Sequence, residues 1–222
     1  MNETIDRERI RRWASCVEDP HQVDEMAVPS YLHANPLIRW LFHKRLQTAA
    51  ALLGVGPFEA GLDFGCGVGL MLPKLAHRTT SVFATDLELG PARAMLDDLG
   101  LANVTLVEPE HLQAAIPVGS LDYVIATDSL EHVDEPATQI ASFATMLRPG
   151  GVFILSGPTE TRLYRLGRLL AGFGGKGHYH HTDIFDLHDT IRADGRFAHD
   201  EGRRLPVPKL VEAFLIDRFR RR

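Results

Sequence analysis

One short segment constrains the fold of this chain more than any other. Residues 62–69 read Leu-Asp-Phe-Gly-Cys-Gly-Val-Gly, and the next apolar run ends in Asp86. This pattern predicts a strand, a tight glycine loop, a helix and a second strand, which is the repeating unit of a parallel sheet. A Cβ at Gly65, Gly67 or Gly69 would block the turn and the approach of a ligand to the backbone. The loop is expected to open a helix whose unpaired N–H groups attract a carboxylate.

The spacing of the loop disfavours two common nucleotide sites. A dinucleotide fingerprint requires Gly or Ala where Leu70 stands, and a P-loop requires a Gly-Lys-Ser/Thr tripeptide that does not follow. Asp63 precedes the first glycine by two residues and would place negative charge beneath a pyrophosphate. A carboxylate there suits a ligand that carries positive charge. Asp86 can accept hydrogen bonds from both hydroxyls of a ribose, and its alternative role is to cap the next helix.

S-adenosylmethionine combines a positive charge, a carboxylate and a ribose, and the chain resembles the class I S-adenosylmethionine-dependent methyltransferases of the small-molecule type. The resemblance covers about residues 50–157 and rests on four segments in the family's order and spacing: residues 63–69, 86–87, 121–132 and 147–151. It implies an α/β, Rossmann-like, doubly wound, mainly parallel seven-stranded sheet that ends in an antiparallel hairpin. The cofactor would then lie across the carboxyl ends of the strands.

The hydrophobic pattern predicts alternating strands and helices along most of the chain. Strands are expected at 60–64, 80–85, 103–107, 121–126 and 151–156, with helices near 69–78, 90–99 and 136–147. A hairpin is expected from 196–204 and 212–219. Before these elements, a helix is expected over 6–16, a loop through Pro20 and Pro29, and a helix over 36–53 that begins at Asn35 and Pro36 and stops at Gly54. Helices at 159–173 and 182–194 would follow the fifth strand.

A single domain is expected at this chain length. Residues 1–54 would form an N-terminal helical cap, and residues 55–222 a methyltransferase domain with a lid insertion at about 158–190. Leu37, Trp40 and Leu46 are expected on the packed side of the helix in the cap.

The resemblance also implies which residues bind the cofactor. They are Asp63, Gly65, Cys66, Gly67, Gly69, Asp86, Leu87, Glu108, Asp128 and Ser129. Glu108 stands where the family has an acid near the adenine amino group, but the next residue is Pro109, which has no N–H for an adenine nitrogen. Either Glu110 and His111 take over this role or apolar contacts hold the adenine.

Candidate catalytic residues are three histidines. His180 and His181 belong to a run at residues 178–181 that is followed by Asp183. The run is interpreted as a general base, with His180 ahead of His181, or as a structural turn that closes the lid. A metal site is the weaker interpretation because the spacing matches no zinc pattern, and no metal ligand is assigned. His132 would order the substrate or support the loop.

Three further residues are expected to contact the substrate, or else to pack within the cap: Tyr31, His33 and Arg39. The remaining expectations follow from composition. A formal net charge of −5 argues against a nucleic-acid partner. No apolar run is long enough to span a bilayer and no signal peptide is recognised, so a cytoplasmic location is expected. Oligomeric state stays open, with a homodimer as one option.

The sequence thus predicts direct methyl transfer from S-adenosylmethionine to an oxygen, nitrogen or carbon of a small-molecule acceptor. Two alternatives remain open. A nicotinamide-dependent oxidoreductase is disfavoured by Leu70 and Asp63. A non-catalytic module that binds S-adenosylmethionine would keep the glycine loop but lack access for a substrate or catalytic groups.

Overall fold

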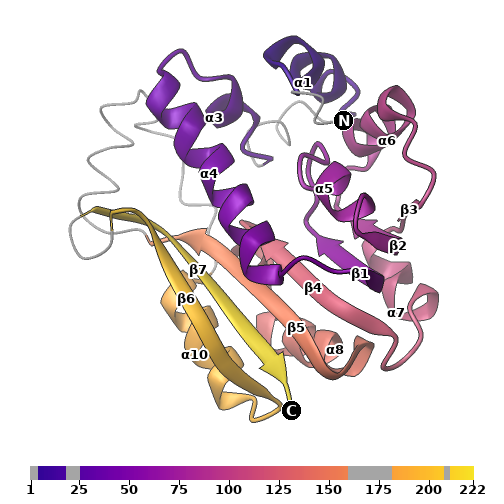
Figure 1. Ribbon diagram of the computed structural model, residues 1–222, viewed down its shortest axis with the longest axis vertical. Coiled ribbons are helices and arrows are strands. Elements are labelled where there is room, and N and C mark those ends of the chain that lie inside the picture. Colours follow the sequence, from indigo (N-terminus) through magenta and orange to yellow (C-terminus); the bar gives the residue numbers. More distant parts are fainter. Residues whose placement is uncertain (1–4, 19–25, 160–181, 208–210) are drawn as a thin grey trace.

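The computed structural model describes residues 5–18, 26–159, 182–207 and 211–222. It shows one twisted seven-stranded sheet with helices on both faces, in the order β3-β2-β1-β4-β5-β7-β6 (Figure 1). The strands from β3 to β5 run parallel, and β7 pairs antiparallel with both β5 and β6. The strands are β1 (Phe58–Phe64), β2 (Thr79–Thr85), β3 (Val104–Leu106), β4 (Leu121–Thr127), β5 (Leu147–Pro158), β6 (Phe197–Val207) and β7 (Val211–Arg221).

The helices divide between the two faces of the sheet. They are α1 (Arg7–Ala14), α3 (Val28–Leu32), α4 (Pro36–Leu53), α5 (Leu72–Ala76), α6 (Gly90–Leu99), α7 (Leu112–Ala115), α8 (Pro136–Met146) and α10 (Ile184–Ala193), with two 3-10 turns, η1 (Pro109–His111) and η2 (Leu130–His132). Residues from α1, α3, α4, α5 and α6 share one apolar cluster, and residues from α7, α8 and α10 share the other.

Successive side chains of the central strands belong alternately to the two apolar clusters. On β4, Tyr123 and Ile125 belong to the first cluster, whereas Val124 and Ala126 belong to the second. Successive side chains of a strand point to opposite faces, so a strand covered by helices on both faces is apolar throughout. The α/β, mainly parallel sheet with a final antiparallel hairpin is therefore confirmed.

The first long helix follows its local signals closely. Helix α4 begins at Pro36 and ends at Leu53, as expected, and the Asn35 Oδ1 atom accepts a hydrogen bond of 2.9 Å from the Leu37 N–H. An N-cap side chain satisfies one of the first N–H groups, which have no partner within the helix. The expected packed side is only partly correct, because Leu37 and Trp40 are 71% and 51% exposed while Leu46 is buried.

Two other local expectations are corrected, and the helix expected at 182–194 is confirmed as α10 (Ile184–Ala193). Pro29 lies within helix α3 rather than in a loop, because proline is tolerated in the first turn of a helix. The helix after the glycine loop begins at Leu72, with Pro73 in its first turn, rather than at Gly69. Asp183 caps helix α10 through a hydrogen bond of 2.7 Å from the Phe185 N–H to Oδ1. Of the expected lid, residues 160–181 lie outside the described residues.

The N-terminal helices share their apolar cluster with the sheet. Ile10 and Trp13 of α1 and Leu46 of α4 are buried in the same cluster as residues of β4 and β5. Helix α4 also lies along β7, where the Arg218 Nη1 atom donates to the Leu52 carbonyl over 3.1 Å. Among the described residues, no helix combines the length and apolar character that crossing a membrane requires.

Candidate functional site

The glycine loop joins the end of β1 to the region before α5. The N–H groups of Gly65 and Cys66 both donate to the Thr85 carbonyl of β2, over 2.9 and 3.0 Å. All three glycines have positive φ, at 74°, 54° and 80° for Gly65, Gly67 and Gly69. A Cβ on Gly65 would lie 2.2 Å from the Ser129 Cβ, so only glycine lets these two loops meet.

The N–H groups of this loop are mostly used within the protein. Gly67 donates to the Asp86 Oδ2 atom over 2.7 Å, and Gly69 donates to the Cys66 carbonyl over 2.9 Å. The N–H groups of Gly65 and Cys66 already bond to the Thr85 carbonyl. Few N–H groups of the loop are therefore left to bind the carboxylate of a ligand, which is the role that the sequence predicted for them. The loop therefore acts mainly as a shaped wall that positions Asp86.

A cavity of about 440 Å³ opens beside this loop at the carboxyl ends of β1, β2 and β4. In an open parallel sheet, ligands bind at this edge where the strand order reverses, and β1 and β4 lie side by side here. Its volume falls within the range of small-molecule sites. The predicted residues that line it are Tyr31, Asp63, Gly65, Cys66, Gly67, Asp86, Leu87, Asp128, Ser129 and His132.

Asp63 forms a buried negative wall of the cavity. The residue is 1% exposed, and neither carboxylate oxygen has a hydrogen-bond partner among the described residues. Burial, and secondarily the nearby negative charge of Asp86, raises the pKa of Asp63 to about 7. A buried carboxylate without partners is costly, so this position favours a cationic group in the cavity.

Asp86 follows β2 and faces the same cavity. Burial raises its pKa, and the hydrogen bonds from the N–H groups of Gly67 and Glu88 act in the opposite direction. A carboxylate has about four lone-pair positions, so the bond from Gly67 leaves acceptors for other donors. The structure thus places one buried acid and one partly exposed acid on the same wall.

A buried arginine was not anticipated from the sequence. Arg45 of α4 is 2% exposed and forms an ion pair with Asp128 of the loop after β4. Its Nη2 atom also donates to the Tyr31 hydroxyl over 3.0 Å, and its guanidinium carbon lies 5.2 Å and 4.9 Å from the ring centroids of Phe42 and Phe214. An arginine on a helix is usually solvated, and its partners here come from distant parts of the chain.

One buried acid next to the cavity, Glu131, contributes to its electrostatics together with the half-buried His132. Glu131 is 2% exposed, and burial is the main reason that its pKa is raised, against the opposing charges of His132 and Arg45. His132 lines the cavity itself and is half-buried. The Ser129 hydroxyl donates to the Phe64 carbonyl over 2.9 Å, which joins the loop after β4 to the end of β1.

Four predicted site residues do not line the cavity. Glu108 is 62% exposed at its side chain and lies 3.2 Å from the His111 Nδ1 atom, whereas the following Pro109 does line the cavity. Gly69 shapes the loop, since a Cβ there would lie 2.3 Å from the Met95 Cε. His33 and Arg39 also lie outside the cavity lining.

Of the expected substrate residues, only Tyr31 reaches the cavity. The His33 Nδ1 atom accepts a hydrogen bond of 3.0 Å from the Asn35 N–H, and Arg39 donates to the carbonyls of His33 and Ala34. These two residues organise the turn before α4 instead. His180 and His181 lie outside the described residues, so their position stays a prediction.

Sequence reasoning also missed several residues that line the cavity. They are Met26, Ala27, Arg45, Leu46, Phe64, Val68, Leu70, Met71, Thr85, Pro109, Thr127, Val133, Asp134 and Gln139. The signal that could have found part of this set is position, because Thr85 and Thr127 end strands whose carboxyl ends meet at one edge. The residues from the N-terminal helices carry no such signal.

Comparisons with known proteins agree with this geometry. The family described as "Methyltransferase domain" matches residues 62–155, which span β1 to β5. A ubiquinone biosynthesis O-methyltransferase from Xanthomonas axonopodis pv. citri is 32% identical over 162 residues, which cover 69% of this chain and 64% of that protein. Residues 62–155 are thereby identified as a class I S-adenosylmethionine-dependent methyltransferase domain. The cofactor of this family is S-adenosylmethionine, as the sequence predicted.

Two crystal structures share this fold over most of the chain. The N-methyltransferase NodS from Bradyrhizobium japonicum, solved with S-adenosylhomocysteine, gives a TM-score of 0.64 at 19% identity and covers 96% of this chain and 97% of NodS. The [4+2]-cyclase SpnF gives a TM-score of 0.69 at 14% identity, covering 91% of each chain. At these identities the similarity establishes the fold alone. The chain spans about half to two thirds of the length of the curated relatives it matches.

Proposed function

We propose that this protein transfers a methyl group from S-adenosylmethionine to a small-molecule acceptor. The observation that carries the proposal is the pairing of Asp63 and Asp86 on one wall of a cavity of about 440 Å³. Asp63 is buried without hydrogen-bond partners among the described residues. Asp86 accepts a hydrogen bond from the Gly67 N–H, and its carboxylate can accept further hydrogen bonds from a ligand. This donor-poor, acid-lined wall suits a ligand that presents both a positive charge and hydroxyl groups.

The residues that line the cavity fit different parts of the cofactor. Asp63 would face the positively charged methionine end of the ligand, which satisfies its orphaned carboxylate. Asp86 would accept from the ribose hydroxyls, and charged hydrogen bonds of this kind contribute roughly 1.5–3 kcal/mol each. Leu87 and Pro109 offer apolar surface for the base. When bound, S-adenosylmethionine supplies an electrophilic methyl group on a sulfonium sulfur.

The remaining task of the protein is to align the acceptor and to remove its proton. Holding two reactants in a reactive geometry can contribute roughly 7–11 kcal/mol to lowering the barrier. His132 lines the cavity and is the described residue best suited to order the acceptor or to take a proton from it. His180 and His181 stay alternative candidates for the base, and Tyr31 is proposed to contact the acceptor.

The acceptor is proposed to be a small metabolite with an oxygen nucleophile. The cavity has the size of a small-molecule site, and the net charge of −5 offers no general attraction for nucleic acid. The curated relatives named as ubiquinone biosynthesis O-methyltransferases support oxygen over nitrogen or carbon. A cytoplasmic location stays a prediction, and the oligomeric state stays open with a homodimer as one option.

A two-part experiment tests the proposal. Calorimetric titration should show that S-adenosylmethionine binds the native chain and that Asp86→Ala weakens binding at least tenfold. A panel of phenols, catechols and amines should then be screened for production of S-adenosylhomocysteine. Exposed Asp97→Ala is the control, because its side chain does not line the cavity. Unchanged affinity in Asp86→Ala would contradict the assignment.

The second function kept open is binding without methyl transfer. It is favoured by one observation, that a protein named as a cyclase shares this fold over 91% of the chain. Tight cofactor binding together with no S-adenosylhomocysteine from any acceptor would support that function. Release of S-adenosylhomocysteine that requires an acceptor would exclude it.

A further inference from the structure

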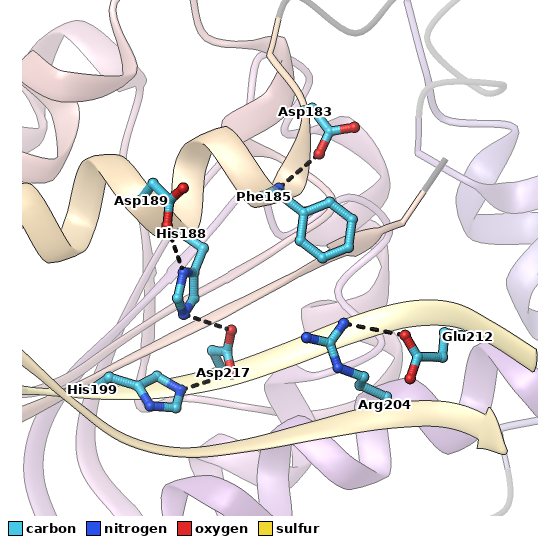
Figure 2. Close-up of polar contacts among 8 residues, drawn as sticks. All are labelled: Asp183, Phe185, His188, Asp189, His199, Arg204, Glu212 and Asp217. Carbon is cyan, nitrogen blue, oxygen red and sulfur yellow. Dashed lines mark hydrogen bonds and ion pairs between the residues drawn. The ribbon is translucent and has the colours of Figure 1, made fainter. Parts of the chain in front are cut away.

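Two histidines and one aspartate converge at the edge of the sheet that lies away from the cavity. His188 comes from α10, His199 from β6 and Asp217 from β7 (Figure 2). The His199 Nε2 atom lies 2.9 Å from the Asp217 Oδ1 atom, and the His188 Nε2 atom lies 3.5 Å from Oδ2. One ligand atom from each residue lies within 4.8 Å of the others, and none of the three residues lines the cavity.

The central carboxylate is buried and incompletely satisfied. Asp217 is 3% exposed, and its Oδ2 atom has no hydrogen-bond partner in the described part of the chain. The opposite nitrogen of His188, Nδ1, lies 3.3 Å from the exposed carboxylate of Asp189 (Figure 2). If Nδ1 carries the proton toward Asp189, the lone pair of Nε2 faces the unpartnered oxygen. Two acceptors that face each other need a cation or a second proton between them.

The backbone makes room for this arrangement. The pairing of β6 with β7 shifts register between His199 and Glu201, which inserts one extra residue. The bulge places His199 and Gly202 over the same stretch of β7, on the side of Asp217. A Cβ on Gly202 would lie 2.3 Å from the Asp217 Oδ1 atom, so a larger residue would displace the carboxylate.

Aromatic packing holds the two imidazoles in place. The rings of His188 and His199 lie 5.3 Å apart, and both contact the ring of Phe219, at 5.5 and 5.3 Å. The side chain of His188 is 18% exposed and that of His199 is 34% exposed, so the cluster is packed but open to solvent on one side. An ion can therefore reach it.

We propose that His188, His199 and Asp217 bind one divalent transition-metal ion, with zinc as the fitting case and water completing the coordination. Two imidazoles and one carboxylate form a ligand set that zinc accepts. With metal–ligand bonds of about 2.0–2.2 Å, tetrahedral ligand atoms lie about 3.4 Å apart. The separations of 2.9 Å, to Oδ1, and 3.5 Å, to Oδ2, lie on either side of that value, with each imidazole facing a different oxygen of Asp217. Asp189 would hold His188 in the tautomer that presents Nε2.

The site would tie α10 to the β6–β7 hairpin. The competing arrangement is a proton-shared His–Asp–His cluster, in which the His199 N–H donates to Asp217 and no metal binds. The two arrangements differ in stoichiometric metal binding, which can be measured without any methyl transfer. Failure of the metal site would leave the proposed function of the cavity untouched.

The test uses the full chain without an affinity tag, stripped with chelator and titrated with Zn²⁺ by calorimetry. One equivalent should bind with micromolar or tighter affinity. Co²⁺ should give visible absorption bands of a tetrahedral site with imidazole ligands. His188→Ala and His199→Ala should each weaken Zn²⁺ binding at least 30-fold. Asp189→Asn should weaken it about tenfold, because it removes only the carboxylate that orients His188.

Two controls separate this site from other histidines. His77→Ala changes an exposed histidine far from the cluster and should leave binding unchanged. A variant with alanine at His178, His180 and His181 should still bind one equivalent. Circular dichroism and cofactor titration report whether each variant is folded. Absence of Zn²⁺ binding below about 100 µM, binding that survives His199→Ala in a folded protein, or loss of binding in the variant at 178–181 would overturn the proposal.

Discussion

A buried carboxylate lies near each end of β1, and the two carboxylates differ in their hydrogen-bond partners. Near its start, the Asp122 carboxylate of β4 accepts from the N–H groups of Glu59 and Ala60 and pairs with Arg148 over 2.8 Å. Near its end, both oxygens of Asp63 have no hydrogen-bond partner among the described residues. Asp122 and Asp63 are 5% and 1% exposed, so burial is nearly equal and only the partners differ.

This contrast indicates that Asp122 stabilises the fold, whereas Asp63 is suited to bind a ligand. A satisfied buried carboxylate joins two strands, and removing it leaves N–H donors without partners. An unsatisfied one costs free energy in the folded protein and is retained where a ligand supplies the missing charge. Substitution of Asp122 should therefore lower mainly stability, whereas substitution of Asp63 should lower mainly cofactor affinity.

The largest effect is expected for Asp122→Ala on stability. The change removes the acceptor for the N–H groups of Glu59 and Ala60 and leaves Arg148 without its partner. The free energy of unfolding should fall by about 3 kcal/mol. Urea denaturation followed by circular dichroism measures this. A loss below 1 kcal/mol would show that the two ends of β1 are not as different as their hydrogen bonds indicate.

The second effect concerns Asp63→Asn and cofactor affinity. The change keeps the shape of the side chain but removes the charge, and S-adenosylmethionine should bind roughly 100-fold more weakly, in keeping with about 3 kcal/mol for a buried charged contact. Calorimetry measures the affinity. Stability at pH 8 should not fall, because the variant no longer buries an unpartnered carboxylate. A destabilised variant with normal affinity would reverse the roles of the two acids.

The third effect is a pH dependence set by Asp63. Its pKa of about 7 in the folded protein lies above the unfolded value of 3.8, so the folded state binds more protons between these values. The contribution of this group to stability is present below about pH 4 and declines as the pH rises toward 7. Cofactor affinity should show the opposite trend and rise about tenfold from pH 6 to pH 8. Asp63→Asn should remove this dependence, and a persisting dependence would assign it to another group.

The smallest effect is expected for Arg148→Ala. The side chain of Arg148 is 57% exposed, and Asp122 keeps both backbone donors when the arginine is lost. The free energy of unfolding should fall by less than about 1 kcal/mol in urea denaturation. A loss as large as that of Asp122→Ala would mean that the ion pair, rather than the backbone contacts, holds this end of β1.

The parts of the fold that local sequence decides were predicted well. Helix α4 was predicted from Asn35, Pro36 and Gly54, because capping and helix termination depend on neighbouring residues. The glycine loop and the acid after β2 identified the cavity, because short-range backbone constraints place them at the sheet edge.

The parts that depend on distant contacts were not predicted. Arg45 is buried because Asp128, Tyr31 and the rings of Phe42 and Phe214 surround it, and no local pattern indicates this. For the same reason, the sequence left His33 and Arg39 open between substrate contact and packing, and the structure places both in hydrogen bonds at the turn before α4. The metal-type cluster around Asp217 combines three elements and has no spacing motif.

Strand β7 follows β6 in the chain but lies between β5 and β6 in the sheet. Among the described strands, β6 pairs with β7 alone, so its place in the sheet depends on the docking of β7 on β5. That docking joins segments far apart in sequence, which slows assembly. Until it happens, β5 presents an open apolar edge, and a chain caught at that stage is exposed to pairing with another copy of itself.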